Sequence, residues 1–251
     1  MFDINLGLIS FFIQNTEWVY APWYVVVPCM LGVCLVAYLL GSVNSAIIVS
    51  KLIYREDIRT KGSGNAGMTN MLRNYGGKAA LLTLAGDLGK TVLAIVVAGI
   101  VFGFRYTPYI ISVSDMCYLA GLCAVLGHIF PVYYGFKGGK GVLATATMAL
   151  VLSPIAFLIL ILLFIGIVAA SRYVSLGSVI VAILYPVLLH GYFGVFETVM
   201  PPFTAISSIA IAIIIVWCHR ANLVRISNRT ENKLSFGKKK AKAEEEETSE
   251  E

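Results

Sequence analysis

The sequence predicts an all-α integral membrane protein, a seven-helix bundle in which some segments are short or broken. Two observations carry this prediction. The 251 residues are 58% hydrophobic and only 13% charged, about half the charged share of an ordinary soluble domain. Stretches without any charged side chain also run from Trp18 to Ser50 and from Gly141 to Ser171. Both are long enough for helices that cross the hydrocarbon core of a bilayer.

The apolar stretches place the segments in order. We expect the first three to cover roughly residues 22–45, 79–103 and 114–131. The stretch 141–171 contains Ser153-Pro154, and proline breaks helices and disfavours helix at the preceding residue. We therefore expect two short segments there. Two more, over residues 173–196 and 198–218, complete the seven.

The basic residues set the number of segments and their orientation. Six of the 19 Lys and Arg lie between Lys51 and Lys78, and eight more lie from Arg220 onward. The positive-inside rule places both groups in the cytoplasm. An unbroken segment over 141–171 would put Arg172 and the basic tail outside, whereas a break restores the rule. The predicted topology is N-terminus out and C-terminus in, with Arg105 outside.

Three regions follow from this topology. Residues 1–21 form an N-terminal extracellular segment, residues 22–236 the membrane domain, and residues 237–251 a disordered cytoplasmic tail rich in Lys and Glu. The five cysteines lie within apolar stretches without a CxxC pair, which argues against a disulfide framework and a zinc site. We expect no metal, no cofactor and no nucleic-acid partner.

The first polar loop, residues 57–70, has a glycine-rich core. Glycines allow backbone N–H groups to converge on an oxyanion, and short polar side chains add donors. An ordinary cytoplasmic turn rich in loop formers is the alternative, but the density of small donors favours a phosphate site. The candidate residues are Gly62, Ser63, Gly64, Asn65, Thr69 and Asn70, with Arg73 following them.

The second loop, residues 135–141, is also glycine-rich, so its backbone N–H groups too are expected to converge on an oxyanion. It opens directly into a predicted helix, whose N-terminus attracts anions. A flexible basic turn at the membrane edge is the alternative. The loop is not a Walker A motif, because Gly141 follows Lys140 where Ser or Thr is required. Its candidate substrate-binding residues are Lys137, Gly138, Gly139, Lys140 and Gly141.

The end of the last segment carries a third polar group. His219, Asn222 and Arg225 recur every three residues and share one helix face. Anchoring at the membrane edge explains the arginine but not the asparagine. Ser175 belongs to a polar interruption at the same predicted face.

Two charges lie inside a predicted segment. Asp87 and Lys90 are three residues apart, and opposite charges at this spacing form a self-neutralising pair. We expect a structural pair that faces the bundle. His128, near the second loop, either supports the site or is a hydrogen-bonded boundary histidine.

These residues resemble the integral membrane glycerol-3-phosphate acyltransferases of bacteria that use acyl-phosphate (PlsY). The resemblance implies a seven-helix enzyme of the bacterial cytoplasmic membrane whose active site faces the cytoplasm. Residues 22–236 become the acyltransferase domain. The matching stretches are Gly41-Ser42, Lys61 through Asn70 with Arg73, Asp87-x-x-Lys90, Gly127-His128 through Gly141, Arg172 through Leu176, and His219-Arg220-x-Asn222 with Arg225 and Glu231.

The implied reaction transfers an acyl chain from acyl-phosphate to the 1-hydroxyl of glycerol 3-phosphate, giving lysophosphatidic acid and phosphate. Both substrates carry phosphate, which suits two phosphate loops, and neither a nucleophilic residue nor a metal is required. Either His219 or a substrate phosphate oxygen accepts the hydroxyl proton. The resemblance implies that the catalytic residues are Ser63, Arg73, His219 and Asn222, with Thr69, Lys137 and Ser175 lining the site.

Two alternatives are disfavoured. No histidine is followed at the fifth position by Asp, which argues against the His-x4-Asp acyltransferases that use acyl-CoA or acyl carrier protein. A transporter of a phosphorylated solute would place its binding site near the bilayer midplane, whereas these polar groups gather at one predicted edge.

Overall fold

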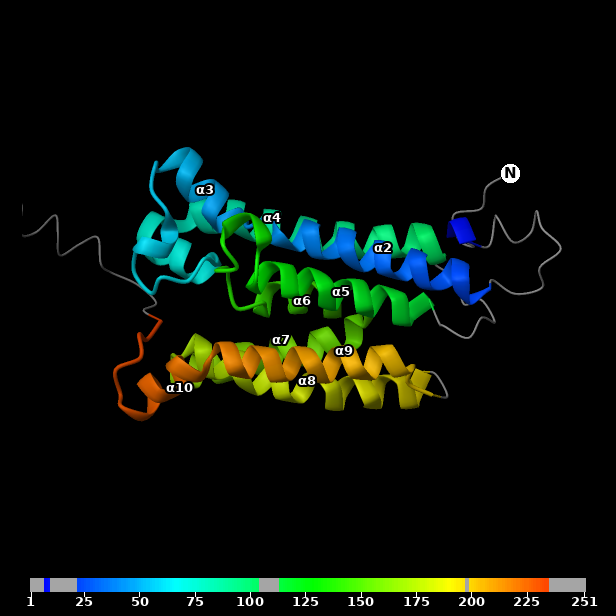
Figure 1. The fold of residues 1–251 in the computed structure, drawn as a ribbon. Helices are drawn as coiled ribbons and strands as arrows, with labels where there is room; N and C mark the ends of the chain where they lie inside the picture. Colours follow the sequence, from blue (N-terminus) through cyan, green and yellow to red (C-terminus); the bar gives the residue numbers. More distant parts are fainter. Residues whose placement is uncertain (1–6, 10–21, 104–112, 197–198, 235–251) are drawn as a thin grey trace, which may run out of the picture.

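The computed structural model describes residues 7–9, 22–103, 113–196 and 199–234, which form an all-helical bundle (Figure 1). The predicted extracellular segment 1–21, apart from residues 7–9, lies outside the described residues. So do Arg105 and the predicted tail 237–251.

The first predicted segment is a helix with a break near its end. Helix α2 covers Trp23–Ser42 and helix α3 covers Ser45–Ile53. Between them, the Asn44 side chain accepts a hydrogen bond of 3.1 Å from the Ile47 backbone N–H, as an N-cap residue does. The chain therefore restarts as a helix after two extended residues.

Helix α4, Met68–Phe102, begins earlier than expected and is bent. Gly76 has φ +80° and ψ −172° within it, a conformation that residues with a side chain rarely adopt. The turns before Gly76, which carry Asn70 and Arg73, are thereby set apart from the membrane-spanning part.

The predicted break at Ser153-Pro154 is confirmed. Helix α6 ends at Leu152, Ser153 is non-helical with φ −149° and ψ 68°, and α7 begins at Pro154. Proline is well placed at a first helical position, because the N–H that it lacks has no intrahelical partner there. The remaining elements are η1 Ile58–Thr60, α5 Val113–Ile129, η2 Val132–Tyr134, α6 Val142–Leu152, α7 Pro154–Ser171, α8 Val174–Phe196, α9 Pro202–Cys218 and α10 Arg220–Ser227.

Over the described ranges, five helices are long and apolar enough to cross a membrane, and a sixth is counted if α9 and α10, bent by 50°, are one span. Helix α6 has only 11 residues, or about 16 Å, and is too short for a full crossing. Each of the seven predicted segments thus has a helical counterpart, and the fold class is confirmed.

Helix α5 lies at the centre and packs against α2, α4, α6 and α9, while α8 packs against both α7 and α9 (Figure 1). The α2–α5 contact is made backbone to backbone. A Cβ on Gly41 would lie 2.7 Å from the Ala124 Cα atom, and one on Gly127 would lie 2.7 Å from the Ser42 nitrogen. Small residues allow such close approach between helices in membranes.

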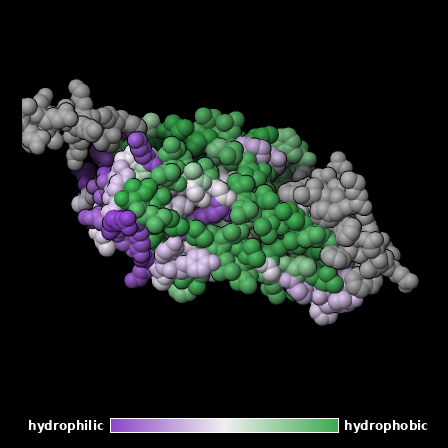
Figure 2. Space-filling view, turned by 90° about the horizontal axis from the view of Figure 1, so that it is seen from above, coloured by the Kyte–Doolittle hydropathy of each residue, from purple (hydrophilic) through white to green (hydrophobic). Residues whose placement is uncertain are grey.

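The loops that the charge pattern assigned to one side meet at one end of the bundle. Arg59 donates to the carbonyl of Tyr134, Arg73 to that of Asn232, and Leu234 to that of Arg172. Figure 2 shows hydrophilic residues gathered at this end, left in both views, and hydrophobic residues along the flank. Exposed side chains such as Leu162 and Ile213 on the outer helices suit contact with lipid. We call this end the polar end; its orientation toward the cytoplasm stays a prediction.

Candidate active site

The Asn70 side chain organises the first loop from within. It is 2% exposed. Its Nδ2 donates to the carbonyls of Ile58 (3.3 Å), Lys61 (3.0 Å) and Asn65 (3.1 Å). Its Oδ1 accepts from the Ser63 N–H at 3.1 Å. Because these groups are engaged within the loop, the geometry gives Asn70 a positioning role, and a direct contact with substrate stays a prediction.

The rest of the glycine-rich core is arranged around this amide. Gly62 and Gly64 have φ of +55° and +71° and are exposed, as is Ser63 between them. Asn65 and Thr69 are half-buried, with Thr69 in the first turn of α4. The hydroxyl of Ser63 is therefore presented at the surface of the polar end, on a turn that glycines make accessible.

Arg59 fastens the first loop to the second. Its Nη1 donates to the carbonyls of Tyr134 at 2.8 Å and Lys137 at 3.3 Å. Its Nε and Nη2 bind the Asp57 carboxylate at 3.0 and 2.8 Å. The hydrogen bonds from Arg59 lower the pKa of Asp57 to about 2, so the carboxylate stays ionised at neutral pH and holds the guanidinium in place.

The glycines of the second loop serve close packing. The Gly138 N–H donates to the Ile129 carbonyl at 3.1 Å and the Gly139 N–H to the His128 carbonyl at 3.0 Å. We expected such N–H groups to converge on an oxyanion; for these two glycines that reason is wrong, because backbone carbonyls occupy the donors. Gly139 is needed because a Cβ there would meet the His128 ring and lie 2.9 Å from the Ala66 carbonyl oxygen.

The two lysines of this loop have different surroundings. The Lys137 side chain is exposed, whereas that of Lys140 is half-buried and donates from Nζ to Asn222 Oδ1. Gly141, with φ +80°, follows it as the N-cap of α6. Lys140 is therefore the cation through which the second loop contacts the C-terminal segment.

The Glu231 carboxylate accepts hydrogen bonds from three side chains in the C-terminal part of the site. Its Oε1 accepts from Ser175 Oγ at 2.8 Å and from Asn222 Nδ2 at 2.7 Å, and its Oε2 accepts from Arg225 Nε at 2.7 Å. Its side chain is only 7% exposed. Burial alone would raise the pKa of Glu231, but these hydrogen bonds hold it below its usual value, so an ionised carboxylate joins α8, α10 and the segment after them.

Glu231 is the member of the site to which the sequence assigned no role. It matched the resemblance only as one residue of a motif. A signal was present: it is an acidic residue six positions after Arg225 in an otherwise basic stretch. Spacing alone could not show that Ser175, 56 residues away in sequence, would share the same carboxylate oxygen.

The electrostatics of this cluster favour an anion. The pKa of Lys140 is lowered to about 8, mainly by burial; the charge of Glu231 opposes this change, and the nearby charges of Arg225 and Arg73 add to it. Both arginines thus lie close enough to Lys140 for their charges to repel its own, beside the single carboxylate of Glu231. An added phosphate group would relieve that repulsion.

His219 and Arg73 complete the predicted residues. The His219 ring is 3% exposed, and its Nδ1 lies 2.8 Å from the Ile215 carbonyl. Because a carbonyl can only accept, Nδ1 carries the proton, and in the neutral ring Nε2 is an acceptor. Arg73 is exposed, with a hydrogen bond of 3.4 Å from Nη2 to the Asn232 carbonyl, so most of its donors are available to a ligand.

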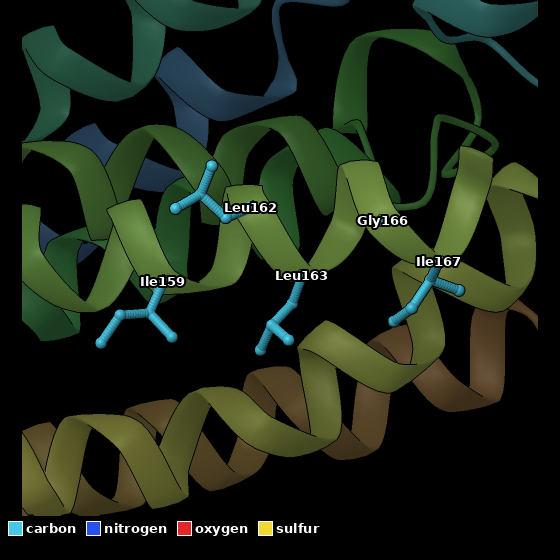
Figure 3. A pocket seen from close by; sticks show the side chains of 5 residues that line it. All are labelled: Ile159, Leu162, Leu163, Gly166 and Ile167. Carbon is cyan, nitrogen blue, oxygen red and sulfur yellow. The ribbon is translucent and has the colours of Figure 1, made fainter. Parts of the chain in front are cut away.

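An apolar groove of about 460 Å³ runs along α7 (Figure 3). In this view the side chains of three lining residues point from α7 toward α8: Ile159, Leu163 and Ile167. No polar side chain lines the groove, so it has no group for catalysis and suits hydrocarbon. Its lining residues are Ile159, Leu162, Leu163, Gly166 and Ile167.

Comparison with known proteins identifies the family. The family described as Glycerol-3-phosphate acyltransferase matches residues 31–229. The chain is 38% identical over 230 residues to the glycerol-3-phosphate acyltransferase of Chlorobaculum tepidum, an alignment that covers 83% of this chain and 98% of that protein.

Solved structures agree. Two crystal structures of PlsY (YgiH), an integral membrane glycerol 3-phosphate acyltransferase, are 32% identical in sequence. The glycerol 3-phosphate form has a TM-score of 0.71 and the lysophosphatidic acid form one of 0.69. The alignments cover 82% of this chain and 96% and 95% of those chains. The resemblance inferred from the motifs is thereby confirmed, and the chain belongs to the glycerol-3-phosphate acyltransferase family of integral membrane enzymes.

Proposed function

We propose that this enzyme transfers an acyl chain from acyl-phosphate to the 1-hydroxyl of glycerol 3-phosphate at the polar end, releasing lysophosphatidic acid and phosphate. One observation carries the proposal. Lys140 and Arg225, from two separate segments, contact the Asn222–Glu231 pair. Arg73, from a third segment, bonds the carbonyl of Asn232 next to Glu231 and lies close enough to act on the charge of Lys140. A cluster with this excess of positive charge, at the edge of an apolar bundle, suits two phosphate-bearing substrates of which one has a hydrocarbon chain.

The acceptor substrate and the product have the clearest support. The similar PlsY structures are a glycerol 3-phosphate form and a lysophosphatidic acid form. In this chain the corresponding ligands would bind where Ser63, Arg73, Lys140 and Asn222 face the polar end. Arg73 suits a phosphate group because its planar guanidinium can donate two parallel hydrogen bonds to two oxygens.

The donor is acyl-phosphate. The acceptor hydroxyl oxygen attacks the acyl carbonyl carbon, the bond between that carbon and the phosphate oxygen breaks, and phosphate leaves with the electron pair. Negative charge grows on the carbonyl oxygen and on the leaving phosphate, and Lys140 and the neighbouring arginines are placed to stabilise it. The apolar flank, with its groove along α7, offers hydrocarbon surroundings for the acyl chain while its head remains at the polar end.

The proton of the attacking hydroxyl needs an acceptor. His219 holds its Nδ1 proton on the Ile215 carbonyl, which makes Nε2 the basic nitrogen, as a general base requires. A phosphate oxygen of the substrate is the other acceptor. A His219→Gln variant separates these two acceptors. If His219 is the base, the variant should lose most of its turnover while it keeps the KM for glycerol 3-phosphate. If the phosphate oxygen is the base, turnover should be largely retained.

The polar end faces the cytoplasm of a bacterial cell. Basic residues are concentrated there, including Lys51, Arg55, Lys61, Lys78 and Arg220, as expected on the cytoplasmic side of a membrane protein. This arrangement supports both the N-out, C-in topology and the cytoplasmic position of the site. A cysteine introduced in place of Lys78 should react with an impermeant thiol reagent only after the membrane is opened.

The donor is tested with purified protein in detergent. Glycerol 3-phosphate is incubated with acyl-phosphate, acyl-CoA or acyl carrier protein separately, without metal or nucleotide, and lysophosphatidic acid is measured. We expect product only with acyl-phosphate. Efficient turnover with acyl-CoA, or an absolute requirement for Mg²⁺, would overturn the mechanism. Product formed in detergent, where no compartment exists, also separates an enzyme from a transporter.

A further inference from the structure

The ammonium group of Lys90 is buried and has three polar partners, one in an ion pair and two within hydrogen-bond distance. Nζ lies 2.9 Å from Asp87 Oδ1, 2.8 Å from the Val43 carbonyl oxygen and 3.0 Å from His128 Nδ1. The side chains of Lys90, Asp87 and His128 are 5%, 1% and 4% exposed. A lysine that only neutralised Asp87 would need one of these contacts; the other two lead elsewhere.

One contact leads to the first loop. The Val43 carbonyl belongs to the break between α2 and α3, where no helical N–H is available to it, and Lys90 supplies the missing donor. The next residue, Asn44, is fully buried and donates from Nδ2 to the Ala66 carbonyl at 3.4 Å. Ala66 lies in the glycine-rich core of the first loop. Fixing the break therefore fixes the attachment point of that loop.

The other contact leads to the second loop. Because protonated Lys90 can only donate, His128 Nδ1 accepts, and the neutral ring carries its proton on Nε2. The Nε2 edge packs directly against the Cα of Gly139, so closely that a Cβ there would overlap it. The His128 carbonyl also accepts from the Gly139 N–H. The orientation of this ring therefore sets the position of Gly139, next to Lys140.

We propose that Lys90 is a positioning residue for catalysis, which sets the relative geometry of the two loops from inside the membrane domain through Val43 and His128. Asp87 neutralises the buried charge so that the ammonium can be kept there. The proposal rests on the proposed function only in that both loops serve phosphate-bearing substrates. It assigns to Lys90 a role beyond the structural ion pair that the sequence predicted.

The test removes the charge pair in two ways. The double variant Asp87→Asn/Lys90→Met is neutral but has no donor for Val43 and His128. The double variant Asp87→Asn/Lys90→Gln is equally neutral and keeps two N–H donors. Thr83→Val is the control, because Thr83 is buried on the same helix and bonds only within it, to the Ala79 carbonyl at 2.9 Å. The melting temperature in detergent, kcat, and KM for both substrates are measured beside the wild type.

We expect the Met variant to lose at least tenfold in kcat/KM, with KM raised for at least one phosphate substrate, and to melt close to the Gln variant. The Gln variant should stay within about threefold of the wild type, and Thr83→Val should be unchanged. Equal kcat/KM in the two double variants would overturn the proposal, because a pair needed only for neutrality treats both alike.

His128→Phe provides a second test if the Met variant fails to fold. This variant keeps the Asp87–Lys90 pair and the backbone hydrogen bond between His128 and Gly139, and removes the ring nitrogen that Lys90 contacts. We expect a raised KM for glycerol 3-phosphate or for the donor, and unchanged KM values for both would overturn the proposal. Stabilisation of the protein by glycerol 3-phosphate alone, measured by melting, gives a donor-independent readout. An error about the donor would appear as an inactive wild type, whereas an error about Lys90 would leave the wild type active.

Discussion

Arg59 and Tyr134 lie 75 residues apart in the chain, yet Arg59 Nη1 donates a hydrogen bond of 2.8 Å to the Tyr134 carbonyl oxygen. The Lys137 carbonyl shares the same nitrogen at 3.3 Å, and Asp57 holds the rest of the guanidinium. The first loop thus fastens the second from the aqueous side, while the Lys90 network supports both from within.

Replacing Arg59 with Ala should raise KM for a phosphate substrate on the order of tenfold, because hydrogen bonds from a charged donor to two carbonyls are lost. Arg59→Lys should recover little, since an ammonium cannot span Asp57 and both carbonyls. Lys51→Ala is the control: Lys51 also contacts Asp57, at 3.5 Å, but is 51% exposed and does not reach the second loop. Steady-state kinetics in detergent measures the difference, and equal KM values for the Arg59→Ala and Lys51→Ala variants would contradict a role in joining the loops.

Replacing Arg73 with Ala should reduce kcat/KM by about a hundredfold or more, the loss typical of one transition-state donor. Folding should be intact, because the exposed side chain has only a hydrogen bond of 3.4 Å to the Asn232 carbonyl. Lys78→Ala removes an exposed charge from the same helix beyond the Gly76 bend and should leave the kinetics unchanged. Activity is measured on variants shown by melting to be folded; normal turnover of Arg73→Ala would reject its role.

Activity should fall as the pH rises past about 8. Burial lowers the pKa of Lys140 to about 8, so its cation is present below that pH and is lost above it. Phosphate monoesters are already dianions above neutral pH, so the substrate does not produce this change. The pH profile of kcat/KM reports groups of the free enzyme. Lys140→Arg should move the alkaline limb beyond pH 9, whereas Lys137→Arg should leave it in place; an identical limb in all three proteins would exclude Lys140 as its source.

Gly138→Ala and Gly139→Ala should weaken apparent affinity for a phosphate substrate by displacing the second loop. At Gly138 a Cβ would lie 2.7 Å from Pro131 Cδ and 3.0 Å from the Ile129 carbonyl oxygen, and neither is the end of a flexible side chain. Gly77→Ala is the matched control, since a Cβ there has no neighbour within 4 Å. KM values for both substrates are compared, and unchanged values would show that this loop is only a connector.

The parts of the fold that depend on local chemistry could be predicted from the sequence. Proline after Ser153 marked the break between α6 and α7, and the distribution of basic residues identified which loops share one end. The early start of α4 was missed, because Gly76-Gly77 and the polar residues before them are typical of a loop. The structure retains helix on both sides of Gly76.

Within the site, residue types were more predictable than their partners. Asn222 was expected to be catalytic, and Lys140 and Ser175 to bind substrate. In the structure Glu231 joins Asn222 to Ser175, and Lys140 contacts Asn222. The second-loop glycines were expected to donate N–H groups to a phosphate, but the N–H groups of Gly138 and Gly139 donate to the backbone carbonyls of Ile129 and His128. Which carbonyl accepts from which N–H depends on helix packing across the chain, and local spacing does not contain that information.

The unequal lengths of α6 and α7 have a consequence for where a lipid meets the enzyme. The two helices meet at Ser153 and return toward the same end, but α7 has 18 residues and α6 only 11, a difference of about 10 Å along the helix axis. Lys140, just before α6, therefore lies closer to the middle of the bundle than Arg172, just after α7, and we expect it to lie deeper in the membrane as well. For the donor that we propose, acyl-phosphate, this depth means that the phosphate could reach Lys140 while the acyl chain remains within the bilayer.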